Sequence, residues 1–259
     1  PASERPFLDE VSRAPGRLRV AFSFDAGLAK SLHPENRAAL EATTAQLAAL
    51  GHEVVEVRLP LPPESFIEGY ASLVSADVAA VLRAAKQLVG REATSDDVEL
   101  ATWMLAKMGE ALSGADVTEA LWNMQVFSRQ WLAWSADFDV LLTPTVGVPP
   151  LPIGAYKLPA LQRQGLKLLA ALPGGALLSQ RPKIVEAFGQ VFEASPYTMV
   201  ANVTGQPSMS LPLHWTTDGL PMGMLFTART GDEATLFRLA AQIEQAMPWK
   251  DRRPPHAAA

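Results

Sequence analysis

Two serines that flank Met209 are the residues of this chain that most resemble a nucleophile pair. Ser208 and Ser210 lie in the stretch PSMSLPL, which is typical of a strand. Residues two apart point to the same face of a strand, so the two hydroxyls should lie together. A serine hydroxyl is a weak nucleophile without a base in hydrogen-bond reach, and no lysine or histidine is adjacent to them in sequence. We therefore expect both serines to be structural.

The sequence does not contain the residues or motifs that other common catalytic mechanisms require. There is no cysteine, and the motifs G-x-S-x-G, S-x-x-K, H-E-x-x-H, the P-loop and G-x-G-x-x-G do not occur. Four histidines are present, and none shares metal-ligand spacing with another on one helix or strand: His33, His52, His214 and His256. We expect no metal, no cofactor and no catalytic residue within the chain.

Carboxylates are the remaining candidates for acid and base work. Adjacent pairs occur at three expected helix starts: Asp9-Glu10, Asp96-Asp97 and Asp232-Glu233. Negative charge at a helix start offsets the positive end of the helix dipole, so we interpret these pairs as caps. Asp137 and Asp139 are alternate residues at a strand edge. An unrelated enzyme that uses them as a carboxylate pair is one alternative reading.

Composition limits the class of protein and its partners. The 259 residues are 48% hydrophobic, which is enough for a substantial core, and the net charge of −5 disfavours nucleic acid as a partner. The sequence shows neither a secretory signal nor a run of apolar residues long enough to span a membrane. We expect a cytoplasmic protein that binds no membrane, with a linker at 1–17, one domain at 18–250 and a tail at 251–259.

The order of elements predicts an α/β fold, in which a mixed β-sheet is covered by helices. Residues 18–24 and 52–59 read as strands on either side of a helix at 37–50, which favours a parallel pair. Three helical segments should follow between 64 and 137, then a buried strand at 139–144. A helix broken at Pro173 is expected within 167–180, where a lid or an oligomer contact is one option. A helix at 195–204, an antiparallel hairpin and a closing helix at 232–247 complete the chain.

The third helical segment has an apolar face that allows two interpretations. Spacings of three and four residues place Met124, Phe127 and Trp131 on one side of the helix. Packing in the core accounts for this pattern, and so does the apolar wall of a substrate pocket.

Three motifs in a fixed order resemble one family of enzymes. The longest is NVTGQPSMSLPL followed by DGLPMG and GDEATLFRLAAQIE; the others are PFL with PGRLRVA near the start and FDVLLTPT in the middle. Together they resemble the C-terminal portion of the amidase signature family. Members cleave amide bonds with a lysine, a bridging serine in a cis peptide and a nucleophilic serine. That Ser-cisSer-Lys triad belongs to an N-terminal portion, and its Gly/Ser-rich tract does not occur in this chain.

The resemblance implies a supporting role for this chain. It would complete the sheet and supply part of a substrate pocket, with the N-terminal portion of the same enzyme as partner and a small amide as substrate. Ser195 falls where glutamine-amidotransferase members carry a substrate-binding aspartate, which argues against recognition of an ammonium group. The implied substrate-binding residues are Thr143, Pro144, Thr145, Ser195, Tyr197, Thr198, Phe127 and Trp131.

Two further expectations concern the chain by itself. It should be inactive alone, and apolar surface left by the missing portion should require a partner, a homodimer being one option. The alternative to a hydrolase is a non-catalytic α/β binding or scaffold module derived from the same fold. Apolar side chains near the implied pocket favour aryl, acyl or ω-amino-acid amides.

Overall fold

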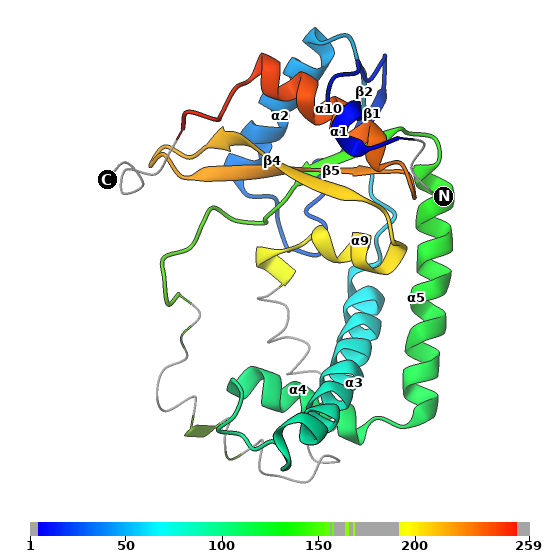
Figure 1. The fold of residues 1–259 in the computed structure, drawn as a ribbon, viewed down its shortest axis with the longest axis vertical. Helices are drawn as coiled ribbons and strands as arrows, with labels where there is room; N and C mark the ends of the chain where they lie inside the picture. Colours follow the sequence, from blue (N-terminus) through cyan, green and yellow to red (C-terminus); the bar gives the residue numbers. More distant parts are fainter. Residues whose placement is uncertain (1–4, 156, 158–163, 166–167, 169–191, 253–259) are drawn as a thin grey trace. The chain divides into compact units, whose positions relative to one another are not determined.

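The computed structural model describes residues 5–155, 157, 164–165, 168 and 192–252 (Figure 1). All of the expected helix at 167–180 except residue 168, and most of the expected tail, lie outside these residues. The chain divides into two compact units. Unit 1 comprises 1–61, 128–151 and 192–259, and unit 2 comprises 62–127 and 152–191.

Unit 1 contains the mixed sheet that the sequence predicts. Its strands are β1 (Arg19–Phe22), β2 (Glu53–Glu56), β3 (Val140–Pro144), β4 (Ser208–Trp215) and β5 (Pro221–Ala228). They lie in the order β2-β1-β3-β5-β4. β1 is parallel to both β2 and β3, whereas β5 is antiparallel to β3 and β4. The predicted parallel pair and the predicted hairpin are both confirmed.

Helix α2 (Pro34–Ala49) connects β1 to β2, as the sequence predicts. Pro34 suits the first turn because its fixed φ matches a helix and its missing N–H would have had no partner there. The side chain of His33 accepts a hydrogen bond from the Glu35 amide and so caps the helix. The chain then turns at Gly51, whose φ of 93° favours glycine.

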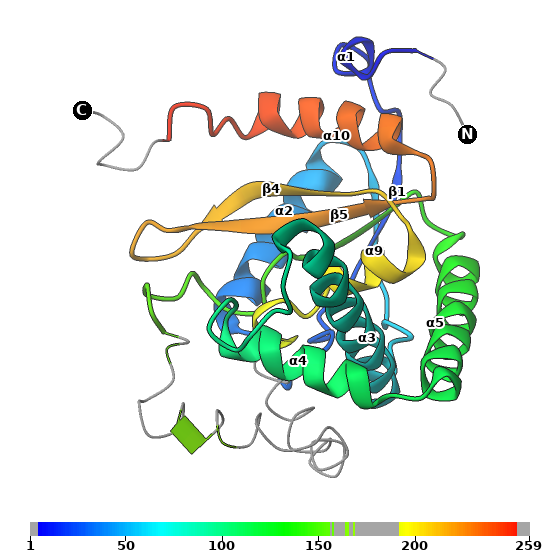
Figure 2. The same cartoon turned by 60° about the horizontal axis from the view of Figure 1, so that its bottom comes forward.

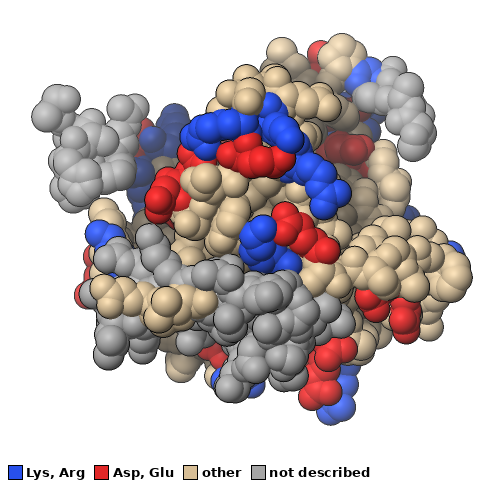
Figure 3. All heavy atoms as spheres, turned by 90° about the horizontal axis from the view of Figure 1, so that it is seen from below, with Lys and Arg blue, Asp and Glu red and all other residues tan. Residues whose placement is uncertain are grey.

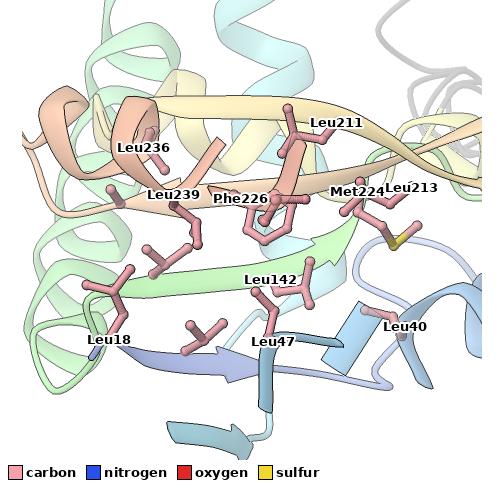
Figure 4. Close-up of a cluster of buried hydrophobic side chains, with 14 of the residues drawn as sticks. Leu18, Leu40, Leu47, Leu142, Leu211, Leu213, Met224, Phe226, Leu236 and Leu239 are labelled. Atoms are coloured by element: carbon pink, nitrogen blue, oxygen red, sulfur yellow. The ribbon is translucent and has the colours of Figure 1, made fainter. Parts of the chain in front are cut away.

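One face of the sheet packs on α2 and α10 (Glu233–Ala246) and forms the core (Figures 2 and 4). The strands supply alternate side chains to this face, because successive residues of a strand point to opposite sides. Along β4 this face takes Met209, Leu211 and Leu213, and along β5 it takes Met224 and Phe226. The hydroxyls of Ser208 and Ser210 therefore belong to the opposite face, where α9 (Thr198–Thr204) lies.

Helix α9 begins later than the sequence predicts. The expected start was Ser195, but the helix starts at Thr198 with Tyr197 as its N-cap. Pro196 explains the delay, because a proline disfavours helical backbone at the residue before it. The predicted end is confirmed: Gly205 adopts a left-handed φ of 71°, and its amide bonds the carbonyl of Ala201.

Unit 2 is helical. It holds α3 (Pro63–Val89), α4 (Leu100–Ala111) and the first part of α5 (Gly114–Ser135), which confirms the three predicted segments. Gly109 on α4 lets the helices approach closely, since a Cβ there would lie 2.0 Å from the Ser75 carbonyl oxygen on α3. By length and composition alone α3 is apolar enough to cross a membrane, with a mean hydropathy of 1.3. Core helices pass the same test.

A short helix, α1 (Phe7–Glu10), lies within the segment that the sequence predicts as a linker. It packs on α10: the Phe7 ring stacks on Phe237 at 5.0 Å, and Glu10 accepts a hydrogen bond from Arg238. Glu10 is only 2% exposed and also lies near Arg5 and Arg13. The arginines hold the pKa of Glu10 below its usual value, chiefly through the hydrogen bond from Arg238.

Candidate functional site

Three loops meet where the parallel strands of unit 1 end. They are residues 23–28 after β1, 57–61 after β2 and 145–148 after β3. The carboxyl ends of parallel strands share one edge of a sheet, which is where α/β proteins commonly bind ligands. A hydrogen bond of 2.8 Å from the Leu59 amide to Asp25 Oδ2 joins the first two loops. This edge is the candidate site.

The segment 193–197, which precedes α9, closes this edge. The Leu28 amide donates to the Pro196 carbonyl at 3.1 Å, and the Gly147 amide donates to the Ala194 carbonyl at 2.9 Å. A Cβ on Gly147 would lie 1.8 Å from the carbonyl oxygen of Glu193, so only glycine allows this approach. Both contacts join residues far apart in the sequence and fix the segment against the loops.

A buried asparagine on α2 holds the loop after β3. The Nδ2 group of Asn36 donates to the carbonyls of Val146 and Gly147, both at 2.9 Å. The side chain is fully buried, and its Oδ1 has no hydrogen-bond partner among the described residues. Because a buried amide is costly to leave unpaired, these two bonds make Asn36 a structural anchor of the site.

Tyr197 is a buried residue of the closing segment that contacts the loop after β1. Its ring packs against Gly27, where a Cβ would lie 2.8 Å from the ring, and its hydroxyl donates to the backbone carbonyl of Asp25 at 2.8 Å. Burial, and then the charge of Asp25, raise the pKa of Tyr197. The phenol therefore stays protonated at neutral pH and acts as a hydrogen-bond donor.

A small cavity lies beside Tyr197, within unit 1. Its volume of about 20 Å³ is enough for about one water molecule, whereas pockets for small ligands are typically several hundred Å³. The lining is mainly apolar and comprises Leu59, Leu61, Trp131, Leu141, Thr143, Tyr197, Val200, Ala201, Leu225 and Thr227.

The Gly-Gln-Pro turn of the longest motif orients one wall of this cavity. Gln206 is buried, and its Oε1 accepts a hydrogen bond of 3.0 Å from Trp131 Nε1. Its Nε2 donates to the Ala228 carbonyl at 2.9 Å. The amide thus joins α5 to β5 and fixes the indole ring.

Hydroxyl pairs cover the sheet face next to the cavity. Thr145 and Ser210 lie 2.6 Å apart and Ser208 and Thr227 lie 2.8 Å apart, each measured between hydroxyl oxygens. A hydroxyl is not a base strong enough to activate a serine. The nearest histidine in sequence, His214, follows an irregularity of the β4 pairing, and its Nε2 bonds a carboxylate oxygen of α2 instead.

The structure brings some of the predicted pocket residues together. Three of them line the cavity, namely Thr143, Tyr197 and Trp131. Thr145 follows β3 and pairs with Ser210 of β4 through their hydroxyls. Ser195 and Thr198 are half-buried in and just after the closing segment.

Two predicted residues are not among those that line the cavity. Pro144 is buried in β3, opposite Met224 of β5. Phe127 lies in unit 2, where its ring contacts Phe66 with 4.9 Å between ring centres. Asp25, Asn36 and Gln206 were not among the predicted residues. The sequence held a local signal for two of them: Asp25 directly follows a predicted strand, and Gln206 lies in the Gly-Gln-Pro turn of the longest motif.

The alternative carboxylate pair has a structural explanation. Asp139 Oδ2 accepts from the Arg19 amide at 2.7 Å, and its Oδ1 lies 3.2 Å from Arg229 Nη2. The backbone carbonyl of Asp137 accepts from the Arg19 guanidinium. Among the residues described, no three His, Asp or Glu side chains are grouped to hold a metal. On the face drawn in Figure 3, basic and acidic residues adjoin one another.

The fold and this edge define an α/β protein with a candidate ligand site at the ends of its parallel strands. A family model described as Amidase matches residues 1–237. The chain is 30% identical over 259 residues to the 6-aminohexanoate-cyclic-dimer hydrolase of Paenarthrobacter ureafaciens. It is 33% identical over 256 residues to the putative amidase AmiB2 of Mycobacterium bovis. The chain therefore belongs to the amidase signature family.

The same relatives show that the match is partial. Each of the two matches covers 98% of this chain and 49% of the relative. A solved 6-aminohexanoate cyclic dimer hydrolase, complexed with substrate, superposes with a TM-score of 0.79 at 30% identity, covering 98% of this chain and 50% of that one. A bacterial aryl acylamidase shares the fold at 16% identity, with a TM-score of 0.71. The chain spans about half the length of the relatives it matches.

Proposed function

We propose that this chain is the C-terminal portion of a hydrolase that cleaves carbon-nitrogen amide bonds. The catalytic lysine, bridging serine and nucleophilic serine would come from an N-terminal portion. One observation carries this proposal: the chain matches half of each amidase along nearly its own full length, while the hydroxyls of Ser208 and Ser210 pair with threonine hydroxyls.

In this proposal the chain's own residues bind and position the substrate. Thr143 and Thr227 would present hydroxyls, and Tyr197 and Trp131 would form a rigid wall held by Asp25 and Gln206. The cavity in this chain is too small for an amide, so the pocket would need the N-terminal portion to complete it.

The apolar lining favours amides with an apolar acyl or ω-amino-acid chain. Two relatives have names that fit this class, being hydrolases of the 6-aminohexanoate cyclic dimer. A charged side chain on the substrate is disfavoured, because no described ionisable group lines the cavity other than the protonated Tyr197.

Reconstitution tests the proposal. Residues 1–259 are assayed alone and with the N-terminal portion encoded upstream, using an acyl p-nitroanilide and a cyclic dimer of an ω-amino acid. We expect turnover only in the mixture, and none when the nucleophilic serine of the added portion is replaced by alanine. Turnover by residues 1–259 alone would refute the assignment of the chemistry to the other portion. Binding without turnover in the mixture would favour the scaffold module.

A further inference from the structure

A second cavity of the sheet unit lies at the end of α10. Its volume of about 510 Å³ is within the range of pockets that hold small molecules. It shares no residue with the cavity beside Tyr197. We call it the β4–α10 groove, and its lining comprises Leu213, His214, Trp215, Met247, Pro248 and Arg252. Because Leu213 belongs to the core face of β4, the groove lies on the side of the sheet that carries α2 and α10.

The segment 247–252, which follows α10, forms one wall of this groove and is held in place. The Met247 amide donates to the Ile243 carbonyl at 2.7 Å, where the helix ends. The side chains of Met247 and Trp249 pack against the core. The Arg252 amide then donates to the Trp249 carbonyl at 2.9 Å, so the chain turns there. These contacts fix the backbone that carries the Arg252 side chain.

The end of β4 forms the other wall. The pairing with β5 resumes at His214 after a register shift, and Trp215 lies opposite Pro221. His214 Nε2 lies 2.7 Å from Glu35 Oε2 of α2, so the histidine and this carboxylate are already engaged with each other. Both walls therefore belong to elements that the sheet and the core hold in position.

Arg252 brings an unpaired positive charge to the groove. Its guanidinium lies over the Trp215 ring, with 3.9 Å between Cζ and the ring centre. This contact uses the charge of the group but occupies none of its five N–H donors with an oxygen. Within the described part of the chain, no carboxylate forms an ion pair with Arg252. The indole thus holds the guanidinium, and its donors remain available to a ligand.

The residues around this guanidinium select the chemistry of the ligand. A planar fork of N–H donors matches a carboxylate, which it can bind through two parallel hydrogen bonds. Three of the other lining residues are apolar, namely Leu213, Met247 and Pro248. An apolar chain or ring attached to the carboxylate would be removed from water against them, which adds affinity that a bare inorganic anion cannot gain.

We propose that the β4–α10 groove binds a small carboxylic acid in its ionised form, with the carboxylate on Arg252 and an apolar chain or ring against Leu213 and Met247. Acids of this class are also what the proposed hydrolysis of amides releases. The inference does not rest on that function, because binding to this groove requires no turnover. Its failure would leave the proposed function untouched.

Titration with hexanoate, followed by proton–nitrogen NMR, tests this site. Residues 1–259 are measured alone and in the mixture with the N-terminal portion, at constant ionic strength, and Trp215→Phe assigns the indole signal. We expect the Trp215 indole N–H to shift with a Kd of about 1 mM or below. Hexanamide, the neutral match of the probe, should bind at least about tenfold more weakly, because it lacks the charge that Arg252 recognises.

A matched pair of variants separates the guanidinium from the general charge of the segment. Arg252→Gln removes the proposed ligand of the carboxylate, whereas Lys250→Gln removes the same charge at an exposed position outside the lining. We expect the first change to weaken hexanoate binding by at least about tenfold and the second by less than about twofold. Circular dichroism and the melting temperature check that both variants fold.

Four results would each overturn the proposal in a different way. If hexanoate at about 50 mM shifts the Trp215 signal in neither sample, the groove is not a site for this class of ligand. Equal binding of hexanamide would leave an apolar groove without recognition of the carboxylate. Equal binding of inorganic phosphate would show a general anion site. Equal losses in the two folded variants would show attraction by the net charge of the segment, with no specific role for Arg252.

Discussion

Tyr197 combines a buried ring, a backbone partner 172 residues away and a position on the cavity wall. Its raised pKa favours the neutral phenol in the folded state. A group whose pKa is raised on folding contributes stability that is complete below the unfolded pKa, near 10, and is lost as the pH rises above it.

Replacing Tyr197 by phenylalanine tests this linkage. Removing the hydroxyl should cost about 1 kcal/mol at pH 7, because the Asp25 carbonyl loses its donor. The variant should also lose less stability than the wild type between pH 9 and about pH 11, since it has no phenol to ionise. Urea denaturation at each pH measures both effects. Parallel loss of stability in the two proteins above pH 9 would contradict the prediction.

Gly147 is a residue where one methyl group should disturb the site. Alanine there would place its Cβ 1.8 Å from the Glu193 carbonyl oxygen, so the loop or the closing segment must move. We expect a loss of about 2 kcal/mol or more in the free energy of unfolding. Gly114→Ala is the control, because a Cβ there meets nothing within 4 Å and its effect should stay within about 0.5 kcal/mol. Similar small effects of both changes would show that the loop adapts.

At the scale of elements, a buried carboxylate helps to hold α1 on α10. Glu10 binds Arg238 of α10, and its pKa is lowered from an ordinary value of 4.5. A carboxylate with a lowered pKa contributes stability that is complete above the unfolded pKa and is lost as the pH falls through the folded value. The contact between α1 and α10 should therefore weaken below about pH 4.5.

The variant Glu10→Gln should lower the urea midpoint at neutral pH, and the difference from the wild type should shrink as the pH falls below 4.5. Glu244→Gln, at an exposed position of the same α10, serves as the control and should leave the midpoint nearly unchanged. Exchange of the α1 amides reports the local contact. A deficit for Glu10→Gln that persists undiminished to pH 3 would rule out ionisation of Glu10 as its cause.

Elements were more predictable from the sequence than the site was. Alternation along 207–213 and the turn after it predicted the hairpin, because local geometry decides both. The observed start of α9 differs from the predicted one, because Pro196 disfavours helical backbone at Ser195. The site depends on close contacts between distant segments, such as the backbone contact of Gly147 with Glu193 and the hydrogen bond from Tyr197 to Asp25. These join distant segments, and no local pattern encodes them.

At the scale of the whole molecule, two compact units share one continuous helix. Helix α5 begins in the helical unit and ends in the sheet unit, where Trp131 meets Gln206. Large apolar side chains of α5 remain exposed in the described part of the chain, among them Leu121, Trp122 and Val126. Apolar surface of this kind raises the cost of the isolated state and favours a partner.

Binding of the N-terminal portion should raise the stability of the folded chain by an amount that depends on its concentration. A portion that binds only the folded chain should stabilise it by about 2.7 kcal/mol at a hundredfold excess over its Kd, so the melting temperature should rise with the concentration added. Differential scanning calorimetry of residues 1–259, with the N-terminal portion titrated in, measures this shift. An unrelated protein of similar size at the same concentrations is the control. If the transition does not move although the portion binds, binding must be equally tight to the unfolded chain, and the two portions would not form one folded enzyme.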